Sequence, residues 1–90
     1  MHKYGVVNYL LSAVENNYID SININKVSTN NIHIEAKVSN EQKIQPVLWM
    51  IEANMYTKRE LSAKNVNCND NSIVIQLFDD TTYEICIKTK

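Results

Sequence analysis

Apolar residues recur at helical spacing near the start of the chain. The apolar positions follow steps of three and four residues, while Asn8, Ser12, Glu15 and Asn16 fall on the opposite side; the apolar positions are Val6, Val7, Leu10, Leu11, Val14 and Tyr18. This spacing predicts an amphipathic helix over 6–18 with one buried side. Asparagine tolerates the left-handed backbone conformation better than most residues, so Asn16 and Asn17 are expected to end the helix.

Strict alternation of apolar and polar residues predicts the strands. The clearest case is 32–38, where isoleucine, alanine and valine alternate with His33, Glu35 and Lys37. A preceding strand is expected over 22–27, with a turn at Asn30 and Asn31. Later strands are expected around 66–68, over 73–78 and over 83–89, because Asp70-Asn71 and Asp79-Asp80 provide turn residues between them.

A second helix is predicted from Pro46 to about Leu61, since proline is favoured in the first turn of a helix. An alternative start is a capping box formed by Ser39 and Gln42, which would place Pro46 inside the helix. Either start leaves the order αββαβββ. The predicted fold class is therefore α+β, a small single domain with a mostly antiparallel sheet and two helices on one face.

Chain length and glycine content restrict the fold and exclude several function classes. Ninety residues, 44% of them hydrophobic, suit one domain over 1–90. Gly5 is the only glycine, and Pro46 is the only proline. Phosphate-binding loops, dinucleotide-binding turns and nucleophile elbows each need several glycines, because only glycine adopts positive φ cheaply or lets the backbone approach a phosphate closely. None of these motifs is present.

Charge and cysteine content narrow the partners and the compartment. Nine basic and ten acidic residues are intermingled, so the chain has no basic face for nucleic acid, and nucleic acid is not an expected partner. Cys68 and Cys86 are too few for a secreted disulfide scaffold, and we expect both to be reduced in a cytoplasmic protein. No segment approaches the ~20 apolar residues that span a membrane, so no membrane partner is expected.

Candidate catalytic and metal-binding groups are sparse. His33 and Glu35 share one strand face, but two ligands do not make a metal site, and a solvated sheet face is the preferred interpretation. The segment from Asn65 to Asn71 has oxygen donors but lacks the glycine and closing glutamate of a calcium loop. Asp79 and Asp80 are interpreted as a hairpin turn. The sequence therefore predicts no catalytic residue, no bound metal and no cofactor.

The second helix carries the strongest functional signal. Steps of 100° per residue place Trp49 and Tyr56 nearly opposite the apolar arc that contains Leu48 and Ile51. Tryptophan, tyrosine and arginine are enriched at interface hot spots. We therefore predict a partner-binding surface that consists of Trp49, Glu52, Tyr56, Arg59 and Glu60. The alternative, which the sequence leaves open, is that the first helix or a loop buries Trp49 in the core.

The predicted function is a small non-catalytic protein-binding module that inhibits or antagonises a larger protein. Thirteen asparagines and eight lysines against one arginine are typical of AT-rich coding sequences. This usage suggests a phage or mobile-element product, such as an anti-restriction or anti-CRISPR protein. The alternatives are an immunity protein that neutralises a toxin, and a small enzyme or ligand-binding domain with a pocket between helices and sheet. A homodimer through an edge strand is a further prediction.

Overall fold

The computed structural model describes residues 5–57 and 63–89, with side chains for 5–54 and 63–89. Its elements are α1 (Gly5–Glu15), β1 (Ser21–Lys26), β2 (Asn31–Val38), the 3₁₀ helix η1 (Glu41–Lys43), α2 (Ile44–Thr57), β3 (Asn65–Cys68), β4 (Ser72–Gln76) and β5 (Thr82–Thr89). This order confirms the predicted αββαβββ arrangement.

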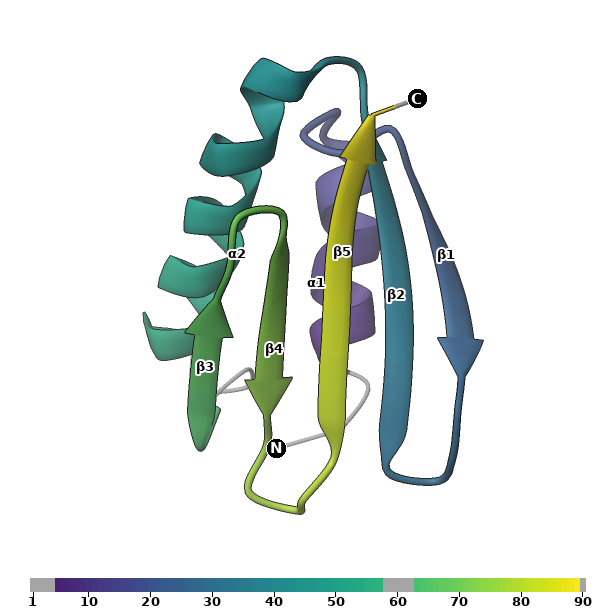
Figure 1. Ribbon diagram of the computed structural model, residues 1–90, viewed down its shortest axis with the longest axis vertical. Helices are drawn as coiled ribbons and strands as arrows, with labels where there is room; N and C mark the ends of the chain where they lie inside the picture. Colours follow the sequence, from purple (N-terminus) through teal and green to yellow (C-terminus); the bar gives the residue numbers. More distant parts are fainter. Residues whose placement is uncertain (1–4, 58–62, 90) are drawn as a thin grey trace.

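The strands form one five-stranded sheet in the order β1-β2-β5-β4-β3. The central strands β2 and β5 run parallel, with Ile34 opposite Ile85. The other three neighbouring pairs are antiparallel. Both helices lie against the same face of the sheet (Figure 1). The fold is therefore the predicted α+β class, with a mostly antiparallel sheet and two helices on one face.

The core lies between the two helices and the sheet. Alternate residues of β2, β4 and β5 point into it, so the burial of each strand follows the period of two that the sequence shows. The largest of its almost completely buried side chains are those of Val6, Leu10, Ile19, Ile34, Leu48, Ile51, Ile73, Ile75, Tyr83, Ile85 and Ile87. Each aliphatic side chain buried in this way contributes roughly 1.5–3 kcal/mol of transfer free energy.

Helix α1 ends at the asparagines expected to terminate it. Asn17 has a φ of 66°, in the left-handed region that asparagine tolerates better than most residues. The amide of Tyr18 then donates to the carbonyl of Ala13 at 2.9 Å and satisfies one of the last helical carbonyls. The helix ends three residues earlier than predicted, so Tyr18 lies beyond it and is exposed, while Ile19 turns into the core.

Helix α2 begins two residues before the predicted start. The 3₁₀ helix η1 leads directly into it at Ile44, and Pro46 lies in its first turn, where a missing N–H is tolerated. The Asn40 side chain that precedes η1 makes no capping hydrogen bond. The predicted end of the helix near Leu61 lies outside the described residues.

The turns predicted between β1 and β2 and between β4 and β5 are both present. The amide of Val27 donates to the Asn31 carbonyl at 3.0 Å and closes the turn between β1 and β2. Between β4 and β5, Asp80 has a φ of 68° and the Asp79 carboxylate accepts a hydrogen bond from the Thr81 amide at 3.0 Å. Asp79 and Asp80 therefore build a turn, as the sequence predicts.

Candidate functional site

Trp49 lies on the solvent side of α2. Its side chain is 61% exposed, whereas that of the preceding residue, Leu48, is completely buried. One residue advances a helix by 100°, which is enough to move a side chain from the core to the surface. Within the described residues, neither α1 nor a loop covers Trp49. The structure therefore excludes the core alternative and leaves the indole available for contact.

The neighbours of Trp49 on one flank face the β3–β4 hairpin. Gln45 donates from Nε2 to the carbonyl oxygen of Asp70 at 2.7 Å. Glu52 is half-buried, and its charge adds to burial in raising the pKa of the Cys68 thiol on β3. Trp49 follows Gln45 by four residues and precedes Glu52 by three, so it lies between them on the helix surface.

The remaining predicted partner-binding residues are only partly placed. Tyr56 belongs to α2, but its side chain lies outside the described residues, as do Arg59 and Glu60 altogether. The structure therefore brings Trp49 and Glu52 to one side of α2 and says nothing about the contribution of the other three. The assignment of all five residues to a partner-binding surface stays a prediction.

A hollow lies on the other flank of α2 and includes Pro46 in its lining. It has a volume of about 440 Å³, lies between α2 and the end of α1, and is lined by Asn17, Tyr18, Lys43, Pro46, Val47 and Met50. Pro46 precedes Trp49 by three residues, so the two are neighbours on the helix surface. We call Tyr18, Pro46, Trp49 and Met50 the interhelix surface. Sequence reasoning did not find this hollow, because Tyr18 was assigned to the helix rather than to the segment after it.

A second hollow of about 300 Å³ lies between the two helices and shares Tyr18 and Met50 with the first. Hydrogen bonds join the helices next to it. The Asn54 side chain donates from Nδ2 to the Tyr9 hydroxyl oxygen at 2.9 Å and to the Met50 carbonyl at 2.8 Å. Burial raises the pKa of Tyr9, and the hydrogen bond from Asn54 offsets part of that rise. The spacing of α1 and α2, and with it the shape of the interhelix surface, depends on this contact.

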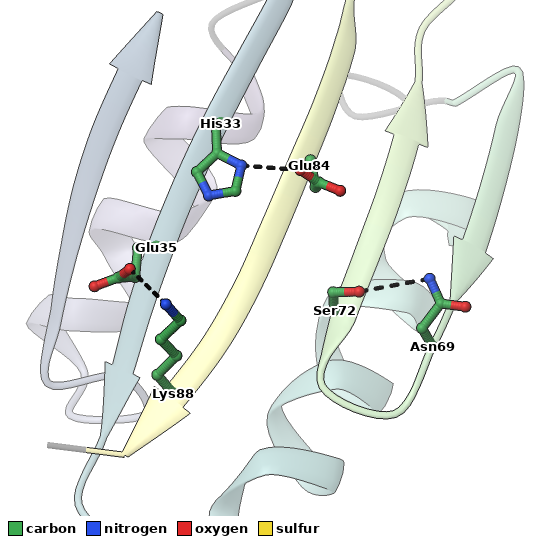
Figure 2. Close-up of polar contacts among 6 residues, drawn as sticks. All are labelled: His33, Glu35, Asn69, Ser72, Glu84 and Lys88. Carbon is green, nitrogen blue, oxygen red and sulfur yellow. Dashed lines mark hydrogen bonds and ion pairs between the residues drawn. The ribbon is translucent and has the colours of Figure 1, made fainter. Parts of the chain in front are cut away.

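The opposite face of the molecule is a polar sheet surface. Figure 2 shows His33 on β2 beside Glu84 on β5, with 3.0 Å between Nδ1 and Oε1. Farther along the same two strands, Lys88 Nζ lies 3.1 Å from Glu35 Oε2. Lys37 Nζ approaches the other oxygen of Glu35 at 3.8 Å. The prediction that His33 and Glu35 share the solvated face of the sheet is confirmed.

Electrostatic contacts on this face shift the pKa of two groups. The hydrogen bond and the charge of Lys88 hold the pKa of the Glu35 carboxyl below its usual range. Burial raises the pKa of the Cys86 thiol, and the negative charges of Glu84 and Glu35 raise it further. Cys86 therefore favours the protonated thiol in the isolated chain, which does not suit an activated nucleophile.

The sheet brings together three groups that are distant in the sequence. His33 lies directly opposite Glu84 in the parallel pair, and Cys86 is two residues farther along β5 on the same face. One ligand atom from each of the three lies within 4.8 Å of the other two. Sequence reasoning missed this cluster, because alternation places each residue on a face but does not say that β2 and β5 are neighbours.

The other candidate groups have structural roles. Asn65 and Asn67 lie on β3, and Asn69 in the following turn donates from Nδ2 to Ser72 Oγ at 3.5 Å (Figure 2). The amide of Asn69 also donates to the Ser72 carbonyl at 2.8 Å. The segment is therefore a polar edge strand and turn rather than a calcium loop. Cys68 and Cys86 form no disulfide in the structure, and their reduced state in the cell stays a prediction.

The edges of the sheet are β1 and β3. They are the strands that the predicted homodimer would use, and both carry several asparagines. No structural observation favours pairing at either edge, so the homodimer stays a prediction. Among the described residues, the structure has no helix that is both long enough and apolar enough to cross a membrane.

Comparisons with protein-family models, with curated proteins and with solved structures each find no match to this chain. Any function of the chain therefore has to be inferred from its own surfaces.

Proposed function

We propose that this chain is a small non-catalytic module that binds a larger protein through the interhelix surface, with Trp49 as the anchoring side chain. The single observation that carries the proposal is the 61% exposure of Trp49 on a rigid helix. When a large exposed aromatic side chain is buried at an interface, its apolar surface is removed from water, and this favours association. Tryptophan is also among the residue types most enriched at binding hot spots.

The surroundings of Trp49 support a protein partner. The hollow beside it is open and mainly apolar, with Pro46 and Met50 on α2 and the exposed Tyr18 after α1. Lys43 lines the hollow, and Glu52 lies on the other flank of Trp49, so the surface carries charges of both signs around its apolar side chains. An apolar centre with a polar rim is the usual arrangement of a specific protein–protein interface.

The space between helices and sheet supports binding rather than turnover. The side chains that face this space are aliphatic apart from Tyr83, and the described ones form a single buried cluster. Among the described residues, the core fills the space where a small enzyme would need its pocket. The hollows lie instead at the surface, which suits recognition of another surface.

Inhibition or antagonism of the partner is the narrower form of the proposal. A module without catalytic groups acts by covering a surface that its partner needs. The assignment to a phage or mobile element, including anti-restriction and anti-CRISPR proteins, rests on amino-acid usage alone. The identity of the captured partner tests this assignment. A toxin as the partner would indicate an immunity protein instead.

The experiment is capture of the partner from the native host with the tagged chain, followed by titration of the purified pair. Trp49→Ala is expected to weaken binding about 30-fold or more, because hot-spot truncations cost ~2 kcal/mol or more. Phe78→Ala is the matched control, since Phe78 is also a strongly exposed aromatic residue but lies in the β4–β5 connection.

Two results would contradict the proposal. One is equal affinity of the wild-type chain and Trp49→Ala for a partner that binds in a stoichiometric complex. The other is conversion of a substrate by the purified chain. Circular dichroism of both variants shows whether each retains the fold, so that a loss of binding is attributed to the missing side chain.

A further inference from the structure

The polar sheet face holds a set of metal-binding donors outside the interhelix surface. Imidazole, carboxylate and thiol groups come from His33, Glu84 and Cys86, and their ligand atoms lie within 4.8 Å of one another. We propose that these three side chains bind a zinc ion on the outer face of the β2–β5 pair. This inference is independent of the proposed partner binding, because both helices, including α2 to which Trp49 belongs, lie on the other side of the sheet.

The backbone positions the three ligands without loops. The parallel register sets His33 opposite Glu84, and Cys86 lies on the same face because side chains alternate along a strand. Zinc ligands stand 2.0–2.3 Å from the metal, which places tetrahedral ligand atoms roughly 3.5 Å from one another. The His33 Nδ1 to Glu84 Oε1 distance is already 3.0 Å. The ligand atoms of all three residues lie within 4.8 Å of one another, so rotation of the side chains, with the strands fixed, brings Cys86 Sγ to the distance that zinc requires.

The chemistry of the donors selects the ion. Calcium and magnesium prefer oxygen ligands alone, whereas a thiolate and an imidazole together suit zinc. The carboxylate of Glu84 and the thiolate of Cys86 balance the two positive charges of the ion. Glu35 lies opposite Cys86 but is paired with Lys88 and Lys37, so we do not count it among the ligands.

The fourth coordination position faces solvent. A hollow of about 320 Å³ next to the site is lined by His33 and Glu84 together with Val27, Asn31, Ile32, Val74 and Thr82. It has room for a water molecule as the fourth ligand. His33 and Glu84 are themselves partly accessible, with side chains 33% and 53% exposed, so an ion reaches them from bulk solvent.

Zinc would link two parts of the chain that are 51 residues apart. The β2–β5 pair is where the α1-β1-β2 part meets the α2-β3-β4-β5 part, and the ion adds a bond across that boundary. An ion that binds the folded state and not the unfolded chain raises the midpoint of thermal unfolding, by roughly 10–20 °C at a hundredfold excess over its Kd.

The test is titration of the reduced full-length chain with Co²⁺ as a spectroscopic probe and with Zn²⁺ by calorimetry. We expect one equivalent of either ion, and a thiolate-to-cobalt charge-transfer band in the near ultraviolet. Cys86→Ser removes this band, and each of Cys86→Ser, His33→Gln and Glu84→Gln weakens zinc binding by about tenfold or more. The stability gain from zinc disappears in the same variants.

Two matched controls make the experiment decisive. Cys68→Ser removes the other thiol, and His2→Gln removes the other imidazole, so both variants are expected to bind zinc like the wild-type chain. The proposal is overturned if zinc binds more weakly than ~100 μM. It is also overturned if Cys68→Ser or His2→Gln abolishes binding while Cys86→Ser does not. Failure here leaves the effect of Trp49→Ala on partner binding unchanged.

Discussion

The side-chain amide of Asn54 on α2 donates a hydrogen bond to the hydroxyl oxygen of Tyr9 on α1, with 2.9 Å between the two atoms. The Tyr9 hydroxyl also lies 3.4 Å from the Met50 carbonyl, to which it donates. These contacts join the two helices at the solvent side of the core, where side chains are only partly buried. They give the first prediction.

Asn54→Ala is expected to lower the free energy of unfolding by about 1 kcal/mol, the usual net value of a partly buried hydrogen bond. A double-mutant cycle with Tyr9→Phe, measured by denaturant unfolding, should give a coupling energy of ~0.5–1.5 kcal/mol. The cycle cancels the change in helix propensity at position 54, since that change is present in both backgrounds. Additive effects of the two substitutions would show that the hydrogen bond does not stabilise the fold.

The raised pKa of Tyr9 leads to a prediction about stability at alkaline pH. Burial raises the pKa of Tyr9 above its usual value, while the bond from Asn54 lowers it and the Tyr18 phenol adds to the rise. The folded state therefore holds its phenolic proton longer than the unfolded chain. The contribution of the protonated Tyr9 to stability is complete below the pKa of about 10 that tyrosine has in the unfolded chain. It is lost as the pH rises through the higher pKa of Tyr9 in the folded state.

Tyr9→Phe removes this contribution to the pH dependence. We expect the free energy of unfolding of the wild-type chain to fall more steeply with pH than that of Tyr9→Phe above about pH 10. Urea unfolding at several alkaline pH values measures both slopes. Equal slopes would mean that Tyr9 ionises equally easily in the folded and unfolded states.

Glu35 gives a prediction for acid pH. Its carboxyl accepts from Lys88 at 3.1 Å, and this contact keeps the pKa below its ordinary value. The ion pair is present above the unfolded pKa of about 4.3, and it is lost as the pH falls through the folded pKa. The Glu35 side chain is accessible to solvent, so the effect on stability is small.

Lys88→Met is expected to move the pKa of Glu35 up toward its ordinary value. The carboxyl carbon shift of Glu35, followed by NMR during an acid titration, measures this directly. Lys43→Met removes an equal charge beside α2 and serves as the control, with no change expected at Glu35. An unchanged titration of Glu35 in Lys88→Met would mean that the ion pair does not persist in solution.

Trp49 and Leu48 provide a paired stability prediction. Trp49→Ala should change the free energy of unfolding by less than ~1 kcal/mol, because the exposed indole loses little packing. Leu48→Ala should destabilise by about 2–5 kcal/mol, because it opens a cavity in the core. Trp49 is the only tryptophan, so its fluorescence should resemble that of tryptophan in water and should be quenched readily by iodide. A blue-shifted, protected emission together with a large loss of stability would place Trp49 in the core.

The sequence by itself determined the elements and the side of each that is buried. Periods of about 3.6 and 2 are local properties, so Leu10 on α1 and Ile34 on β2 could be assigned to the core without a partner in view. Asn17 and Asp80 were recognisable as turn residues because positive φ depends on the residue itself. The α+β class follows from the order of these elements.

Tertiary structure decided which elements are neighbours, and with it the candidate sites. His33 could not be matched to Glu84 and Cys86 beforehand, because the parallel pairing of β2 with β5 depends on packing the whole core. In the same way, the pattern of α2 placed Trp49 nearly opposite the apolar arc that contains Leu48 but did not show whether α1 would cover it. Periodicity specifies the direction of a side chain, whereas the neighbour it meets is chosen by the free energy of the complete fold.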